Sequence, residues 1–172
     1  PAASRNHRAA MVRLAIQGNN MFALDEREID RPGISTTVES LREYQYELGK
    51  NTALCFILGI DAFVKINQWH HWHELFNLCH MIIVARPGYT SIDDYQNLPV
   101  DIRKELIARR VLNAGDLGLQ MNGFIYTAQT SLLEISASHI RSLIAAGKST
   151  RYLLPEIVSD YIQSNYLYVE KI

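Results

Sequence analysis

Two short runs of apolar residues without polar alternation constrain the fold of this chain more than any other feature. They read TALCFILG at residues 52–59 and HMIIVARPG at residues 80–88. A strand with water on one face alternates apolar and polar residues, so a continuous run indicates a strand covered on both faces, as in a parallel sheet. We therefore predict strands in these two runs and a later strand in GFIYTAQT, residues 123–130.

Segments with helical patterns alternate with these strands. Predicted helices cover residues 5–17, 37–48, 135–147 and 154–167; the segment between the first two strands is expected to be a crossover helix, and residues 21–29, MFALDEREI, are a further strand candidate. Thr36 and Glu39 have capping-box spacing, Ser136 is an expected helix cap, and Pro155 lies in the first turn of the last helix. This alternation predicts an α/β fold with a doubly wound parallel sheet, and 172 residues suggest one domain.

Composition excludes several classes of partner. A net charge of −1 gives no general attraction to nucleic acid or to an anionic membrane, and no apolar run approaches the roughly 20 residues of a membrane span. The two cysteines, Cys55 and Cys79, lie in apolar runs and are expected to be buried free thiols. Free thiols are typical of a reducing compartment, so we expect a cytoplasmic protein. The charge and the short apolar runs predict that it binds neither nucleic acid nor membrane.

Ligands of doubly wound sheets bind beyond the carboxyl ends of the strands. The segments that follow the predicted strands are GIDAF at 59–63, RPGY at 86–89 and TSLLEIS at 130–136. These are the places where we expect binding residues.

The segment NQWHHWHELF, residues 67–76, allows three interpretations. His70 and His73 could share a helix face and bind a metal, but the His-Glu-x-x-His motif of metalloproteases is absent and no third ligand is evident. An apolar stripe at helical spacing instead favours core packing, and its members are Trp72, Leu75, Phe76 and Cys79.

Trp69 does not belong to that stripe. It precedes the predicted helix, in the loop after the strand that ends at Gly59, where an indole can lie half exposed at the ligand edge. A flat aromatic ring there can stack on a base-like ring, and the free backbone N–H groups of the helix start suit an anion. Stacking and plain packing both remain open for Trp69 from residue type alone.

The order of several motifs resembles the bacterial nicotinate-nucleotide adenylyltransferases over nearly the whole chain. The matching motifs are Gly-x-Asp at 59–61, Trp-His at 69–70, Arg-Pro-Gly at 86–88 and Ser-x-Ser-x-x-Arg at 136–141. They are accompanied by HRAAMVRLAI at 7–16, RPGISTTVESLR at 31–42 and RYLLPEIVSDYI at 151–162. Each motif alone is weak, and their combination in family order is specific.

The resemblance implies a Rossmann-like nucleotidylyltransferase fold and an enzyme of NAD biosynthesis. Such enzymes transfer AMP from ATP to nicotinate mononucleotide with Mg²⁺, giving deamido-NAD and pyrophosphate. The resemblance implies that Trp69 stacks on the pyridine ring, that the backbone beside His70 meets the ring carboxylate, and that Thr36 and Thr37 line the mononucleotide site. ATP and nicotinate mononucleotide are thus the expected partners, and a homo-oligomer is possible.

The same resemblance implies an ATP site. Gly59 and Asp61 match a pair that contacts adenosine, and Ser136, Ser138 and Arg141 match a helix start that holds the ATP phosphates. These residue types suit the chemistry, because nucleotidyl transfer needs mainly positioning and charge neutralisation. Simpler roles are open for three of them: a plain helix cap for Ser136, a surface ion pair for Arg141 and the cap of the following helix for Asp61.

One family feature does not occur in residues 1–172. The family opens with a strand and the motif Gly-x-Phe-x-Pro-x-His-x-Gly-His, whose histidines help bind the ATP phosphates; His7 lies in a different motif and does not replace them. We therefore leave the catalytic residues unassigned and expect an N-terminally incomplete domain that lacks the first strand and is inactive by itself. The alternatives are a non-catalytic nucleotide-binding or regulatory module, and a metal-dependent hydrolase that uses the histidines. The preference between nicotinate and nicotinamide mononucleotide is left open.

Overall fold

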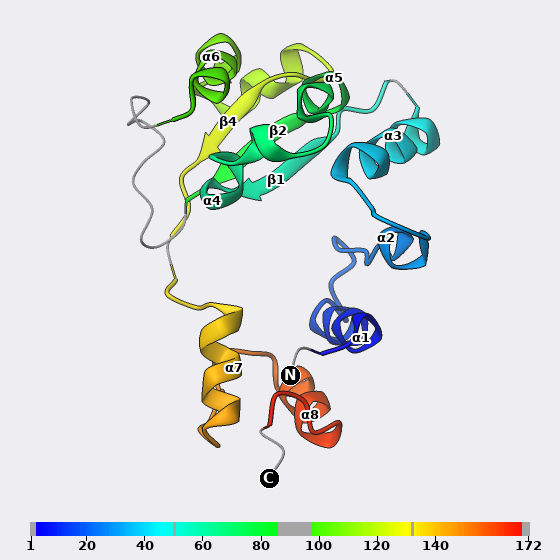
Figure 1. Ribbon diagram of the computed structural model, residues 1–172, viewed down its shortest axis with the longest axis vertical. Coiled ribbons are helices and arrows are strands. Elements are labelled where there is room, and N and C mark those ends of the chain that lie inside the picture. The colour runs from blue at the N-terminus through cyan, green and yellow to red at the C-terminus, as the bar shows by residue number, and fades with distance from the viewer. Residues whose placement is uncertain (1–2, 50, 86–97, 132, 170–172) are drawn as a thin grey trace. The chain divides into compact units, whose positions relative to one another are not determined.

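Among the described residues, the strands form one four-stranded parallel sheet, as predicted for an α/β fold; it lies in the upper part of Figure 1. The computed structural model describes residues 3–49, 51–85, 98–131 and 133–169. The sheet order is β1-β2-β4-β3, with β1 at Cys55–Gly59, β2 at His80–Val84, β3 at Arg110–Val111 and β4 at Ile125–Ala128. Strands β1, β2 and β4 occupy the three predicted runs, so the α/β class and the parallel sheet are confirmed.

The chain divides into two compact units. The sheet unit, Pro32–Leu133, contains all four strands, and the terminal unit combines Pro1–Arg31 with Glu134–Ile172. Helices of the sheet unit are α3 at Thr37–Leu48, α4 at Ile60–Phe63, α5 at Leu75–Leu78 and α6 at Val100–Arg109, with short 3₁₀ turns η1 at Ile66–Gln68, η2 at Trp72–Glu74 and η4 at Ala114–Leu119. Helices of the terminal unit are α1 at Arg5–Ala15, α2 at Arg27–Asp30, α7 at Ala137–Ala145 and α8 at Glu156–Ser164. No helix within the described ranges is long and apolar enough to cross a membrane.

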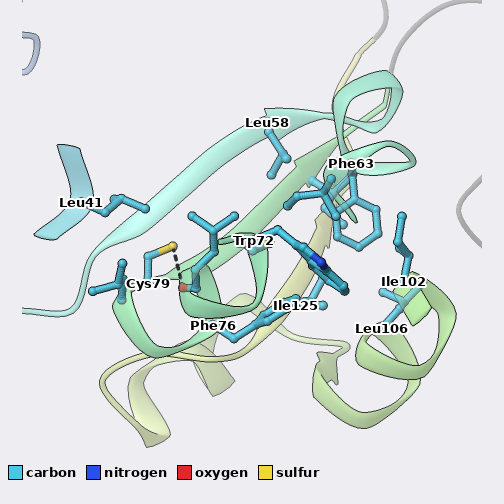
Figure 2. Close-up of a cluster of buried hydrophobic side chains, with 14 of the residues drawn as sticks. Leu41, Leu58, Phe63, Trp72, Phe76, Cys79, Ile102, Leu106 and Ile125 are labelled. Atoms are coloured by element: carbon cyan, nitrogen blue, oxygen red, sulfur yellow. Dashed lines mark hydrogen bonds between the residues drawn. The ribbon is translucent and has the colours of Figure 1, made fainter. Parts of the chain in front are cut away.

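The hydrophobic core of the sheet unit lies on one face of the sheet (Figure 2). Leu58 and Ile83 pair in register and are both buried. The neighbouring residue Ile57, which points to the opposite face, is 63% exposed. The prediction that the first strand is covered on both faces is therefore wrong for β1, because β1 ends the described sheet and the core packs against only one of its faces.

The two cysteines differ for the same reason. Cys79 is buried, as predicted, and its Sγ–H donates to the carbonyl of Leu75 at 3.4 Å. Cys55 is exposed, so the prediction that both thiols are buried is wrong. Cys55 alternates with Phe56 and Leu58 along the edge strand and lies on the open face of β1.

The connection between β1 and β2 is not the single crossover helix that we predicted. It consists of α4, η1, η2 and α5, and His71 interrupts it in the left-handed region at φ 52°. The predicted apolar stripe nevertheless packs into the core, since Trp72, Leu75, Phe76 and Cys79 are all buried. Burial of this stripe does not require a continuous helix.

Residues 21–29 form no strand. The side chain of Asp25 accepts from the backbone N–H of Arg27 at 2.8 Å, and the short helix α2 follows directly. Met21 and Phe22 are exposed, so the apolar residues that suggested a strand have no core to cover. A local bond from the backbone to the Asp25 side chain is therefore found here in place of strand pairing.

Both predicted helix caps are present. Thr36 and Glu39 form a reciprocal capping box at the start of α3, which ends at Gly49. The Ser136 side chain accepts from the N–H of His139 at the start of α7. Helix α1 packs against α8 within the terminal unit, where His7 Nδ1 and the Tyr161 hydroxyl lie 2.9 Å apart, which gives His7 a structural contact.

Candidate functional site

A hollow of about 280 Å³ in the sheet unit brings together four of the predicted binding residues. One wall is the start of α3 with the loop before it, and the other is the turn after η1. The lining residues are Ile34, Ser35, Thr36, Thr37, Val38, Trp69 and His70. Two segments some thirty positions apart in the sequence thus meet around one opening.

The capping box fixes the wall on α3. Thr36 Oγ1 accepts from the Glu39 N–H at 3.3 Å and donates to Glu39 Oε2 at 3.0 Å, while the Thr36 N–H donates to the same oxygen at 3.1 Å. The hydroxyl proton of Thr36 is therefore already used, so this side chain can offer a ligand only its methyl group or a remaining lone pair. The next residue, Thr37, starts the helix at the rim of the hollow.

The opposite wall is a turn that holds Trp69 partly buried. The Trp69 N–H donates to the Ile66 carbonyl at 2.9 Å, and its indole meets Phe56 edge-on with ring centroids 6.1 Å apart. One part of the ring thus packs on the core while another part faces the hollow. Among the described backbone groups, none accepts from the N–H of His70 or His71, which leaves two donors at this turn.

An ion pair joins the two walls. Arg42 on α3 pairs with Glu74 on η2, and the other carboxylate oxygen of Glu74 lies 3.4 Å from Nδ1 of His71. The Gln45 side chain also donates to the Leu78 carbonyl at 3.1 Å. Helix α3 is therefore attached to the segment that carries Trp69 by polar contacts as well as by the core.

Gly59 and Asp61 lie at the carboxyl edge of the sheet. Gly59 ends β1 beside Val84 and is the N-cap residue of α4, where no side chain caps the helix. The alternative that Asp61 caps this helix is therefore wrong. Asp61 is half-buried in the first turn, at the edge where ligands of parallel sheets bind.

Ser136, Ser138 and Arg141 belong to the terminal unit and share the first turns of α7. The two serine hydroxyls are 3.0 Å apart, and Ser136 caps the helix. Arg141 is exposed and has no ion-pair partner in the part of the chain that the structure describes, so the alternative of a surface ion pair has no support there. The hydroxyls and the guanidinium at this helix start, with the first-turn N–H groups that the Ser136 cap does not use, suit an anion.

The histidines of residues 70–80 have individual contacts. His73 faces Glu105, and the buried His80 accepts from the Phe124 N–H with Nδ1 while Nε2 donates to the Gln120 carbonyl. Within the described ranges, no group of three histidine, cysteine, aspartate or glutamate residues could hold a metal ion. This arrangement gives no support to a histidine-bound metal.

The sequence did not indicate every residue that lines the hollow, and one predicted binding segment cannot be placed. Ile34, Ser35 and Val38 line the hollow without having been singled out, although they adjoin the capping box that marks this wall. The Arg-Pro-Gly segment at 86–88 lies outside the described residues.

The sequence is similar to curated proteins over almost its whole length. Residues 1–143 match the family described as cytidylyltransferase-like. The probable nicotinate-nucleotide adenylyltransferase of Serratia proteamaculans (strain 568) is 39% identical over 98% of this chain and 74% of that protein. The probable enzyme of the same name from Cellvibrio japonicus (strain Ueda107) is 40% identical over 98% of this chain and 77% of that protein.

The fold is similar to that of solved structures as well. Plasmodium falciparum nicotinic acid mononucleotide adenylyltransferase complexed with NaAD superposes with a TM-score of 0.64 at 19% identity, over 98% of this chain and 76% of that chain. The same enzyme complexed with APC gives a TM-score of 0.63 over 96% of this chain and 76% of that chain.

Proposed function

Because this chain belongs to the nicotinate-nucleotide adenylyltransferases, we propose that it joins the AMP of ATP to nicotinate mononucleotide in NAD biosynthesis. In this reaction a 5′-phosphate oxygen of the mononucleotide attacks the α-phosphorus of ATP. The bond from that phosphorus to the bridging oxygen breaks, and pyrophosphate leaves while deamido-NAD forms. Such a transfer asks the protein chiefly to align two phosphates and to neutralise their charge.

The hollow between α3 and the Trp69 turn is the observation that carries the proposal. It offers a partly buried indole beside backbone N–H groups that have no acceptor among the described residues, with Thr37 across the opening. A pyridine ring with a carboxylate needs these two features, a flat apolar surface and nearby N–H donors. We assign the nicotinate mononucleotide to this hollow, with its ring on Trp69 and its carboxylate at the backbone of His70.

We propose two sets of contacts for ATP, one for adenosine and one for the phosphates. Gly59 and Asp61 at the carboxyl edge of the sheet are the proposed contacts of adenosine, with the Asp61 carboxylate accepting from ribose hydroxyls. The start of α7, with Ser136, Ser138 and Arg141, is the proposed phosphate site, because N–H donors and an exposed guanidinium favour negative charge.

Mg²⁺ is the proposed cation, arriving with ATP. Such a cation is usually held by the substrate phosphates and one or two carboxylates, without a full set of protein ligands. Asp61 is the one carboxylate among the residues that we assign to ATP. Bound Mg²⁺ would neutralise phosphate charge during transfer. The free thiols of Cys55 and Cys79 fit the proposed cytoplasmic location.

Replacing Trp69 by alanine tests the assignment of the hollow. We expect Trp69→Ala to weaken nicotinate mononucleotide binding by about 1–3 kcal/mol, the value of stacking one ring on an aromatic side chain, with little change in ATP affinity. Calorimetry on the complete protein measures both affinities. Trp69→Phe keeps a stacking surface and should recover part of the loss, and equal losses for both ligands would argue against the assignment.

A further inference from the structure

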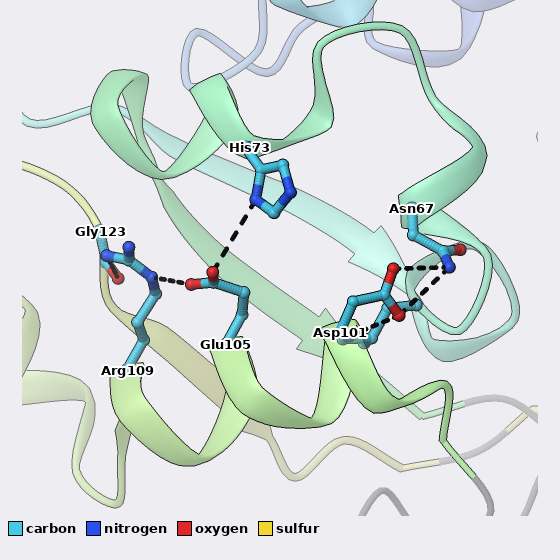
Figure 3. A network of polar contacts seen from close by, with 7 residues as sticks. Asn67, His73, Asp101, Glu105, Arg109 and Gly123 are labelled. Carbon is cyan, nitrogen blue, oxygen red and sulfur yellow. Dashed lines mark hydrogen bonds and ion pairs between the residues drawn. The ribbon is translucent and has the colours of Figure 1, made fainter.

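Helix α6 turns a stripe of charged side chains toward the segment that carries Trp69 (Figure 3). Asp101, Glu105 and Arg109 follow one another at intervals of four residues, so they share one side of the helix. The adjacent residues Ile102 and Leu106 are fully buried in the core of the sheet unit. The core therefore fixes α6 in place, and its charged side reaches the neighbouring turns.

Asp101 holds the residue that lies two positions before Trp69. The amide Nδ2 of Asn67 is 3.0 Å from one carboxylate oxygen of Asp101 and 3.3 Å from the other, so it donates to both. The backbone N–H of Ile102 donates to the same carboxylate at 3.0 Å. The hydrogen bond from Asn67 holds the pKa of Asp101 below its ordinary value, as expected for a carboxylate stabilised in its charged form.

The orientation of the Asn67 side chain depends on its contact with Asp101. Its Oδ1 is buried and has no hydrogen-bond partner among the described residues, so the polar interactions of its side chain there go to Asp101. An amide in such a place is oriented by its single partner. Loss of the Asp101 carboxylate would leave both ends of the amide without a partner.

Glu105 makes a second connection on the other side of Trp69. Its Oε1 lies 3.8 Å from Nδ1 of His73, and its Oε2 accepts from Nε of Arg109 at 2.6 Å. Arg109 in turn donates to the Gly123 carbonyl at 3.4 Å, and its guanidinium covers the Phe76 ring at 4.6 Å from the centroid. Arg109 thus fixes the position of the Glu105 carboxylate that contacts His73.

The two contacts bracket the turn that presents the indole. Asn67 precedes Trp69, His73 follows it, and the backbone between them turns at His71 with a positive φ of 52°. We propose that Asp101, through Asn67 and assisted by Glu105 through His73, is a positioning residue that holds Trp69 ready to stack on the substrate ring; this rests on the proposed function. A pre-ordered wall binds more tightly because less freedom is lost when the ligand arrives.

Exchange of charge between the two partners provides the test. Asn67→Asp places a second carboxylate against Asp101, and the repulsion should separate the turn that carries Trp69 from helix α6. Adding Asp101→Asn to this variant restores an amide–carboxylate pair with the roles reversed. For Asn67→Asp alone, measured in the complete protein, we expect the KM for nicotinate mononucleotide to rise about fivefold, the value of one net hydrogen bond, while kcat and the KM for ATP stay within about twofold. The double variant should return the KM toward its original value.

A second readout does not depend on activity. In a Trp72→Phe background, Trp69 is the remaining tryptophan of residues 1–172, and acrylamide quenching of its fluorescence in this ligand-free chain reports how firmly it is held. Quenching should increase in Asn67→Asp and decrease again in the double variant. Lys104→Gln, an exposed change on the same helix, should alter neither quenching nor KM.

The outcomes separate the two proposals. If quenching and KM are the same in Asn67→Asp as in the parent protein, the positioning role is wrong. The role is also wrong if the double variant is as impaired as the single one. Quenching that follows the expected pattern in a protein that does not use nicotinate mononucleotide would support the positioning of Trp69 and contradict the proposed function. Should Asn67→Asp fail to fold, Asp101→Asn alone gives a milder form of the same test, and an unchanged quenching there would again overturn the role.

Discussion

Arg141 is an exposed guanidinium at a helix start, without an ion-pair partner among the described residues. A phosphate contact from this position strengthens as negative charge moves onto the leaving pyrophosphate, so it should stabilise the transition state more than the bound nucleotide. In the complete enzyme, we expect Arg141→Ala to lower kcat on the order of 10²-fold, about 2.7 kcal/mol in the barrier, with a smaller effect on nucleotide binding.

Steady-state kinetics of pyrophosphate release, together with a binding measurement for ATP, check this expectation. Arg13→Ala removes another exposed arginine, one that pairs with Glu26 on the surface, and should leave kcat unchanged. An unaltered kcat in Arg141→Ala would remove Arg141 from the phosphate site.

Residues of the hollow were predictable where one side chain type serves one chemistry. Trp69 stood out because it falls outside the apolar stripe that includes Trp72, and the structure puts it at the hollow. Ile34 and Ser35 carry no such signal, since they line the hollow only because α3 lies against the Trp69 turn. Local sequence patterns do not predict contacts of this kind between distant segments.

At the level of elements, the capping box of α3 links helix stability to the wall of the hollow. Glu39 accepts from the N–H and the hydroxyl of Thr36, so its removal frees both groups without touching the hollow directly. We expect Glu39→Ala to lower the free energy of unfolding by about 1 kcal/mol, the typical value of a helix cap. Denaturant unfolding measures it.

Glu43 lies one turn later on the same helix, and Glu43→Ala is the matched control for loss of a carboxylate. It should be less destabilising, because Glu43 does not belong to the box. If both variants unfold at the same denaturant concentration as the parent protein, the box does not contribute to the stability of α3.

Elements with local signals were predicted well, and those that depend on tertiary contacts were not. The helices that start at Thr36 and Ser136 have caps that can be read directly from the sequence. The crossover between β1 and β2 has the correct buried stripe but breaks at His71, because the core needs only the stripe. Residues 21–29 have strand-like composition, but Asp25 accepts from the Arg27 N–H and the short helix α2 follows.

On the scale of the whole molecule, apolar runs predicted a parallel sheet but not its order. The order β1-β2-β4-β3 includes a strand of two residues, Arg110–Val111, which is too short to leave a pattern in the sequence. The open face of β1 likewise depends on what packs against it. Local sequence therefore predicts which segments form the longer strands, but not which strands lie next to one another.

Global stability at alkaline pH should depend on Cys79. Burial in the core raises the pKa of this thiol from 9.0 to about 12. An unfolded chain loses the thiol proton above about pH 9 while the folded chain keeps it, so the stability is present in full below about pH 9 and is lost progressively as the pH rises toward the folded value. The slope from this one proton is up to about 1.4 kcal/mol per pH unit.

Comparison of three proteins isolates this contribution, because tyrosines and lysines titrate in the same range in all of them. Denaturant unfolding under reducing conditions, between about pH 8.5 and 10.5, gives the slope for the parent protein, Cys79→Ala and Cys55→Ala. We expect Cys79→Ala to be less stable at neutral pH, from the lost packing, but to have a shallower decline above about pH 9. Cys55 is exposed, so Cys55→Ala should keep most of the decline. A parallel decline in the parent protein and Cys79→Ala would mean that Cys79 ionises in the folded state, and hence that the core around it opens to water at a lower cost than its burial implies.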